Sequence, residues 1–191
     1  MANRYDAISP ELQAFLEAQP VFFVATAPLA TDGHVNVSPK GLDTFRVLGP
    51  RQVMYLDLTG SGNETAAHVA ENGRLTVMFC AFEGRPQIVR LYCRGRVVVR
   101  GAEGWDDALA RFPAQPGVRQ VVVGDVELVQ TSCGYAVPTM TFAGERDQLV
   151  RWAEKKGEEG LVEYRRARNA RSLDGLVAPA PDPRCDVPTK G

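Results

Sequence analysis

Residues 53–73 read VMYLDLTGSGNETAAHVAENG, and the structural pattern changes twice within this stretch. Its first six residues are mostly apolar and rich in strand-forming types, which predicts a buried strand. The glycines that follow end the strand, and Ser61 with Glu64 three residues later fits a capping box at the start of a helix. Asn72 followed by Gly73 is a typical helix end. The stretch therefore predicts a strand, a glycine-rich loop and a helix.

The flanking sequence extends this pattern in both directions. Ser9-Pro10-Glu11 marks the start of a short helix over residues 10–19, with a hydroxyl N-cap and proline at the first helical position. Asp32-Gly33 is a hairpin turn signal. Further strands are predicted at residues 21–27, 34–38, 44–48, 75–82, 88–100 and 118–131, and a further short helix at 104–112. Many short strands separated by turns indicate a mainly β fold with peripheral helices, either a barrel or a sandwich.

The C-terminal third of the chain has a different composition. Residues from about 145 to 171 are heavily charged with both signs, and Gly157 and Gly160 interrupt them, so we expect two helices rather than one. Four prolines from Pro179 to Pro188 indicate an extended or disordered tail. We therefore expect a β-rich domain over residues 1–140, a helical segment over 141–174 and a proline-rich tail over 175–191.

Charge and composition exclude several classes of protein. The 191 residues carry a formal net charge of −1, so no basic surplus is available to bind nucleic acid. No apolar run is long enough to cross a bilayer, and the N-terminus lacks the pattern of a secretion signal, so a cytoplasmic protein is expected. The cysteines and histidines show no metal-ligand spacing, and no metal site is expected. His34 is expected at a strand edge and His68 on a helix surface.

The loop at residues 59–65 is the strongest candidate for binding chemistry. Backbone N–H groups at a helix start, glycines that let a ligand approach, and the hydroxyls of Ser61 and Thr65 suit a phosphate. The alternative is a helix cap and nothing more. A second candidate lies at residues 38–41, where Lys40 is either a solvated strand tip or the second half of a phosphate clamp.

A dinucleotide site of the Rossmann type is a rival hypothesis. Gly60 and Gly62 follow a predicted strand, and Glu83 lies near the end of the next one. The third glycine position holds Thr65, however, and repeated strand–helix–strand units are absent downstream. We therefore reject this hypothesis.

In their order along the chain, these segments resemble the pyridoxamine 5'-phosphate oxidase-like family. The resemblance is carried by VNVSPKG at residues 35–41, by the loop that leads to Glu64-Thr65, and by AENGR at residues 70–74. RGR at residues 94–96 continues it. TSCGYAVP at residues 131–138 resembles a signature of an uncharacterised branch of that family.

The resemblance extends over roughly residues 8–140 and implies a split β-barrel that works as a homodimer and binds FMN in a groove between the subunits. It implies a flavoprotein oxidoreductase that acts on a small molecule. The net charge and the short apolar runs leave neither nucleic acid nor membrane as an expected partner. The alternative is a non-catalytic split barrel that carries a flavin, a deazaflavin or haem. The FMN contacts that the resemblance transfers to this chain are Asn36, Val37, Ser38 and Lys40, then Ser61, Asn63, Glu64 and Thr65, and then Arg90.

The chain departs from the true oxidases at two places. Glu64-Thr65 stand where those enzymes carry an adjacent Arg-Lys pair, and the C-terminal arginine-and-histidine motif that holds their substrate phosphate has no match. Oxidation of pyridoxamine phosphate itself is therefore not expected. No general acid or base is identified, and Tyr135 either lines the cavity or packs beside a glycine turn.

Overall fold

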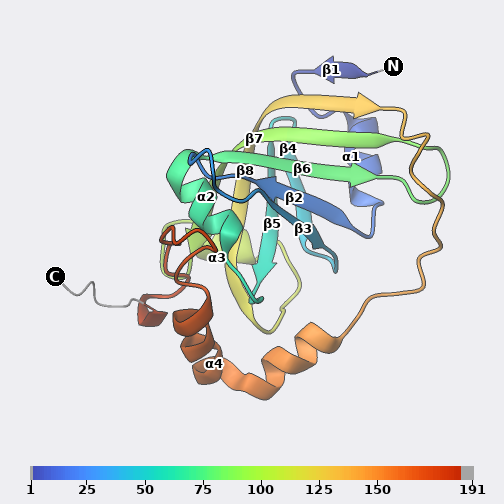
Figure 1. Ribbon diagram of the computed structural model, residues 1–191. Helices are drawn as coiled ribbons and strands as arrows, with labels where there is room; N and C mark the ends of the chain where they lie inside the picture. The colour runs from blue at the N-terminus through green and yellow to red at the C-terminus, as the bar shows by residue number, and fades with distance from the viewer. Residues whose placement is uncertain (1, 186–191) are drawn as a thin grey trace.

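An antiparallel sheet makes up most of the computed structural model, which describes residues 2–185 (Figure 1). Its strands in chain order are β1 (Asn3–Tyr5), β2 (Phe22–Thr26), β3 (Asn36–Lys40), β4 (Phe45–Gly49), β5 (Gln52–Leu58), β6 (Arg74–Cys80), β7 (Ile88–Val99) and β8 (Val118–Ser132). The helices are α1 (Pro10–Glu17), α2 (Glu64–Asn72), α3 (Trp105–Leu109) and α4 (Gln148–Arg168), with a 3-10 turn at Pro183–Cys185. None of the helices in this described part combines the length and apolarity needed to span a membrane. The prediction of a mainly β fold with peripheral helices is confirmed.

The two longest strands, β7 and β8, form the centre of the sheet. The strand order is β3-β2-β6-β7-β8-β5-β4, and β8 also pairs with β1 beyond the end of β5. The sheet curls until β2 and β4 approach each other, with the rings of Phe22 and Phe45 5.4 Å apart. Within residues 2–185, β3 and β4 end the order without pairing to each other. The strands thus form the split β-barrel that was expected.

Apolar side chains from alternate strand positions fill the barrel. On β7, every second residue from Val89 to Gly95 is buried, whereas the residues between them are more exposed. Phe79 on β6 is buried, and its ring centroid lies 4.8 Å from that of Phe45 and 5.5 Å from that of Phe22. The burial of such side chains is the main stabilising contribution to a fold of this kind.

Two helix ends carry the predicted signals and one does not. Ser9 caps α1, and Gly73 ends α2 in the left-handed conformation, with a φ of 70°. The predicted capping box is wrong, because α2 begins after Asn63 rather than after Ser61, and the N-cap side chain makes no cap hydrogen bond. The Asn63 side chain accepts a hydrogen bond from Gln120 instead.

Three further local predictions are corrected. β3 begins at Asn36, two residues later than expected. β1 was not expected, because its three residues are exposed and show no apolar alternation. His68, expected on the surface of a helix, is fully buried, because α2 packs against β2 and places its Nδ1 3.0 Å from Thr26 Oγ1.

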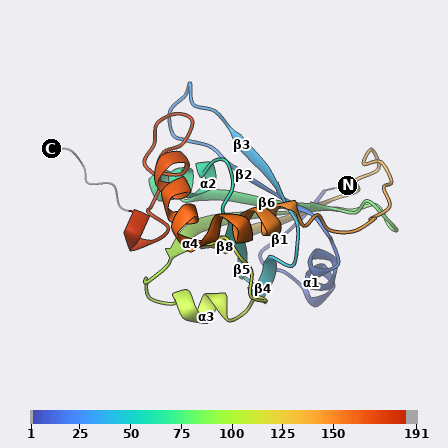
Figure 2. The same cartoon turned by 90° about the horizontal axis from the view of Figure 1, so that it is seen from below.

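The C-terminal helix α4 crosses the lower end of the barrel, as seen from below in Figure 2. Gly157, with a φ of 67°, divides it into two helical pieces, as the sequence predicted. The proline-rich segment is not an extended tail as far as Cys185, because Cys185 is buried and the buried Asp182 forms an ion pair with Arg100. The rest of the expected tail, residues 186–191, lies outside the described residues.

Replacing Phe79 with alanine should lower the free energy of unfolding by about 3–5 kcal/mol, because a buried ring in contact with two others is removed. Urea denaturation followed by tryptophan fluorescence measures this change. Leu29→Ala is the control, since Leu29 is exposed and its truncation should change stability by less than about 0.5 kcal/mol. Equal stability of the two variants would contradict the place of Phe79 in the core.

Candidate functional site

The two segments singled out in the sequence meet at one cavity of about 650 Å³. One wall is β3 and the other is the loop and first turn of α2, residues 60–65, with Arg119 of β8 also at the surface of the cavity. We call this the β3–α2 cavity, and its volume is usual for a small-molecule site. Eight of the nine residues expected to contact FMN line it: Asn36, Val37, Ser38, Lys40, Ser61, Asn63, Glu64 and Thr65.

A buried carboxylate connects β3 to β8 beside the cavity. Asp57 in β5 is 1% exposed, and its Oδ1 accepts a hydrogen bond of 2.8 Å from Lys40 Nζ. Its Oδ2 accepts hydrogen bonds from Arg119 Nη2 at 2.7 Å and from Gln120 Nε2 at 2.8 Å. The Lys40 side chain is therefore not a freely solvated tip, because Asp57 holds it at the cavity while 23% of its surface stays exposed.

The charges around Asp57 leave a positive surplus. Burial alone would raise the pKa of Asp57, but the positive charges of Arg119 and Lys40 outweigh it and hold the pKa well below its ordinary value. The carboxylate is therefore ionised at neutral pH. Two cations share this one carboxylate, so the cluster carries a net positive charge and favours an anionic ligand nearby.

A β-bulge brings Arg119 and Gln120 to the same carboxylate. Neighbouring residues of a regular strand point to opposite faces of the sheet. The register between β5 and β8 shifts where Asp57 pairs with Gln120 and Leu58 pairs with Val118, which leaves Arg119 as the extra residue. Because the bulge changes the direction of Arg119, both side chains reach Asp57.

The Asn36 side chain links β3 to α2. Its Nδ2 donates to Thr65 Oγ1 at 3.1 Å and to Thr26 Oγ1 at 3.2 Å. Its Oδ1 accepts a hydrogen bond of 3.0 Å from Ser38 Oγ. Hydrogen bonds among these polar side chains therefore fix their positions along this side of the cavity without a ligand.

The first turn of α2 borders the cavity with N–H groups that no side chain caps. The Asn63 side chain is turned to Gln120 and to the carbonyl of Asn169, and the Glu64 carboxylate accepts the N–H of Leu173 at 2.9 Å. The first N–H groups of a helix need acceptors from outside the helix. The helix dipole makes this end favourable for an anion.

The C-terminal helix holds the loop of the cavity from behind. Arg165 of α4 is 2% exposed, and it donates from Nε to Thr59 Oγ1 and from Nη2 to the Val118 carbonyl, both at 2.9 Å. Asn169, which follows α4, donates to the Gly60 carbonyl at 3.1 Å. Residues more than a hundred positions along the chain therefore hold the loop, through the Thr59 side chain and the Gly60 carbonyl.

Two sequence-predicted residues lie elsewhere. Arg90 sits on β7 between Met78 and Gln130, and its Nη1 donates to Ser132 Oγ at 3.2 Å, so it does not line the β3–α2 cavity. Its contact with FMN stays a prediction. Tyr135 is 82% exposed and does not line the cavity either. In residues 2–185, no group of three or more His, Cys, Asp or Glu side chains is placed to hold a metal ion.

The sequence interpretation missed the central ion cluster of the site. Asp57 is the only charged residue in an otherwise apolar strand, VMYLDL, and Arg119 and Gln120 begin another apolar strand, VRQVVV. Charged groups in buried strands need partners of opposite charge. The isolated acid and the isolated base could have been paired on that ground.

Replacing Asp57 with asparagine should lower the free energy of unfolding by about 3–5 kcal/mol at neutral pH, because Arg119 is left buried without a counter-ion. Denaturant unfolding from about pH 3 to about pH 7 measures this difference. Because folding lowers the pKa of Asp57, its stabilising effect is present above the ordinary value of 3.8 and is lost as the pH falls towards the folded pKa. A difference that stays constant down to acid pH would contradict the ion cluster.

His34 at the rim of the cavity should titrate with a raised pKa. Its Nδ1 lies 2.6 Å from Asp174 Oδ1, and this hydrogen bond, with the charge of Asp174, raises the pKa of His34 above 6.5. The contact is therefore strongest below about pH 6.5 and weakens as the pH rises through the raised pKa. An NMR titration should show this shift, and Asp174→Asn should reverse it. The same pKa in both proteins would mean that the pair does not form in solution.

The chain is similar in sequence to proteins of one family. Residues 8–133 match the profile of the family described as Pyridoxamine 5'-phosphate oxidase. The chain is 40% identical over 189 aligned residues to the pyridoxamine 5'-phosphate oxidase family protein ustO of Aspergillus flavus. That alignment covers 90% of this chain and 76% of the fungal protein.

Solved structures share the fold at lower identity. A candidate pyridoxamine 5'-phosphate oxidase from Lactobacillus delbrueckii matches with a TM-score of 0.51 and 20% identity, covering 65% of this chain and 94% of that one. A variant of HupZ from group A Streptococcus also matches with a TM-score of 0.51 and 20% identity, covering 65% and 99%. At these identities the two structures support the fold alone. The family profile spans more than half of the chain, and the fungal relative is 40% identical to it. The chain therefore belongs to the pyridoxamine 5'-phosphate oxidase family.

Proposed function

We propose that this chain is a flavoprotein that binds FMN in the β3–α2 cavity and acts as an oxidoreductase on a small molecule. The observation that carries the proposal is the meeting of Lys40 and the uncapped first turn of α2 at one cavity. Both features favour a phosphate. Membership of the family supports FMN as the phosphate-bearing ligand, since the resemblance to that family implies this cofactor.

The residues of the cavity fit a phosphate group. The N–H groups at the start of α2, the hydroxyls of Ser61 and Thr65, and Lys40 would hold it. Asp57 would keep the Lys40 ammonium in place. Glu64, whose carboxylate would repel an anion, is already engaged by the N–H of Leu173.

FMN supplies hydride or electron transfer when it is bound. The chain itself would bind and orient the cofactor. Asn36, hydrogen-bonded to Thr65, would keep β3 and α2 at a fixed spacing around it. Ser38 and Val37 would contribute further contacts from β3. We assign no residue of the chain as a general acid or base.

We further propose that a second copy of the chain completes the site. β3 ends the strand order, so one edge of this strand is unpaired in the described part of the chain. Val35 and Val37 beside this edge are 69% and 61% exposed. Exposed apolar residues on an unpaired strand are typical of an interface. A homodimer would cover them.

The proposed organisation is a cofactor-binding domain over residues 1–140, a helical segment over 141–174 and a proline-rich segment over 175–191. Arg165 gives the helical segment a role in the site, because it holds the loop of the cavity. All four cysteines lie in the described residues and are free, which supports a reducing, cytoplasmic location.

A comparison of FMN with riboflavin, which lacks the phosphate, tests the proposal. Wild-type protein should quench FMN fluorescence on binding and should bind riboflavin more weakly. Lys40→Ala combined with Ser61→Ala should weaken FMN binding by about 3 kcal/mol, since charge-assisted contacts contribute about 1.5–3 kcal/mol each. Riboflavin affinity should stay unchanged in the double variant.

Lys155→Ala is the matched control, because Lys155 is exposed on α4 and does not line this cavity. A wild-type protein that binds FMN and riboflavin equally would mean that the phosphate site is misplaced. Bleaching of the bound flavin by NADH or NADPH would support an oxidoreductase. A haem absorption band in place of flavin absorbance would favour the carrier alternative.

A further inference from the structure

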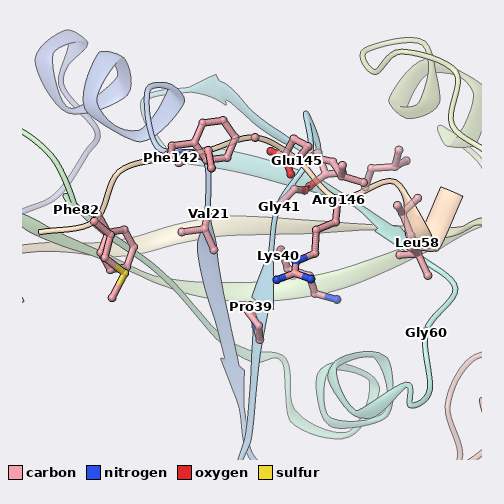
Figure 3. A pocket seen from close by; sticks show the side chains of 18 of the residues that line it. Val21, Pro39, Lys40, Gly41, Leu58, Gly60, Phe82, Phe142, Glu145 and Arg146 are labelled. Carbon is pink, nitrogen blue, oxygen red and sulfur yellow. The ribbon is translucent and has the colours of Figure 1, made fainter. Parts of the chain in front are cut away.

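A second cavity, of about 690 Å³, adjoins the β3–α2 cavity (Figure 3). Pro39, Lys40, Leu58 and Gly60 line both cavities. Its outer wall is the strap, residues 140–146, which belongs to the segment between β8 and α4. We call this second space the strap cavity.

The strap cavity is mostly apolar. Its apolar side chains include Val21, Leu42, Leu56, Phe82 and Phe142. The strap is attached to the turn after β6, because the Met140 N–H donates to the Phe82 carbonyl at 3.0 Å and the Phe142 N–H donates to Glu83 Oε1 at 3.3 Å. An apolar cavity with a few converging polar groups is the usual form of a small-molecule site.

Lys40, Arg146 and Glu145 are the charged residues that line the strap cavity. Lys40 forms an ion pair with Asp57, a carboxylate that it shares with Arg119. Glu145 lies against Gly41, where an added Cβ would be 3.3 Å from its Oε2. Of the two cations of this cavity, Lys40 is therefore paired with a carboxylate, whereas no ion pair within residues 2–185 involves Arg146, and none involves Glu145.

Arg146 is placed to receive an anion. Figure 3 shows its side chain extending from the strap into the cavity on the side of Lys40. Its side chain is exposed, and within residues 2–185 no ion pair holds its guanidinium. A guanidinium presents paired N–H donors whose geometry matches a carboxylate.

We propose that the strap cavity binds a small molecule with an apolar body and one carboxylate, and that Arg146 receives the carboxylate. That this molecule is a substrate rests on the proposed function, whereas its binding to the cavity does not. Because four residues line both cavities, the ligand would lie directly beside the proposed cofactor. The apolar walls would contact the apolar body of the ligand, and Arg146 would bind its carboxylate.

Calorimetric titration of the full chain with 2-naphthoate and with neutral 2-naphthylmethanol tests this site. Wild-type protein should bind the acid about tenfold more tightly than the alcohol. Arg146→Gln should weaken binding of the acid by about tenfold and leave the alcohol unchanged. Phe142→Ala should weaken both, because it removes part of the apolar wall. Arg166→Gln is the matched control, since Arg166 is exposed on α4 and lines neither cavity.

FMN binding, measured on the same proteins, separates the two proposals. Loss of acid binding in Arg146→Gln with FMN affinity retained would support the carboxylate site and exclude unfolding as the cause. Equal affinity of the wild type for acid and alcohol, or an unaltered acid affinity in Arg146→Gln, would overturn the carboxylate site even if FMN binds. Selective acid binding by a protein that ignores FMN would overturn the flavin proposal and leave the carboxylate site standing.

Discussion

The ionised carboxylate of Asp57 is the group on which the geometry of the site depends. A buried charge is stable only when it is paired and fully hydrogen-bonded. Asp57 meets this requirement with Lys40 from β3 and with Arg119 and Gln120 from β8. The partners belong to different strands, so their common attachment to one carboxylate fixes β3, β5 and β8 relative to one another. Lys40 also lines both cavities. By holding Lys40, Asp57 therefore positions the wall between them.

Most of the barrel could be predicted because its signals are local. The alternation of buried and exposed residues along β7, the Ser9 cap of α1 and the Gly73 end of α2 are each visible within a few residues of sequence. β1 had no such signal. Its three exposed residues form a strand only because they pair with the C-terminal end of β8, the longest strand of the sheet.

The site could be predicted only in part, for the same physical reason. The hydroxyls, glycines and lysine of the two binding segments are local features, and the structure brings these segments to one cavity. Their supporting contacts are not local. Arg119 reaches Asp57 through a change of register between two strands, and Arg165 reaches Thr59 from 106 positions along the chain. Neither the bulge nor the docking of α4 is visible as a pattern in the sequence around Asp57 and Thr59.

The attachment of α4 to the loop makes two distant parts of the molecule open together. Arg165 holds the Thr59 side chain and Asn169 holds the Gly60 carbonyl, so a fluctuation that detaches the helix also releases the loop. A ligand that binds only the ordered loop lowers the population of this opened state. Amide protons in α4, which the ligand does not touch, would then exchange more slowly when the cavity is filled.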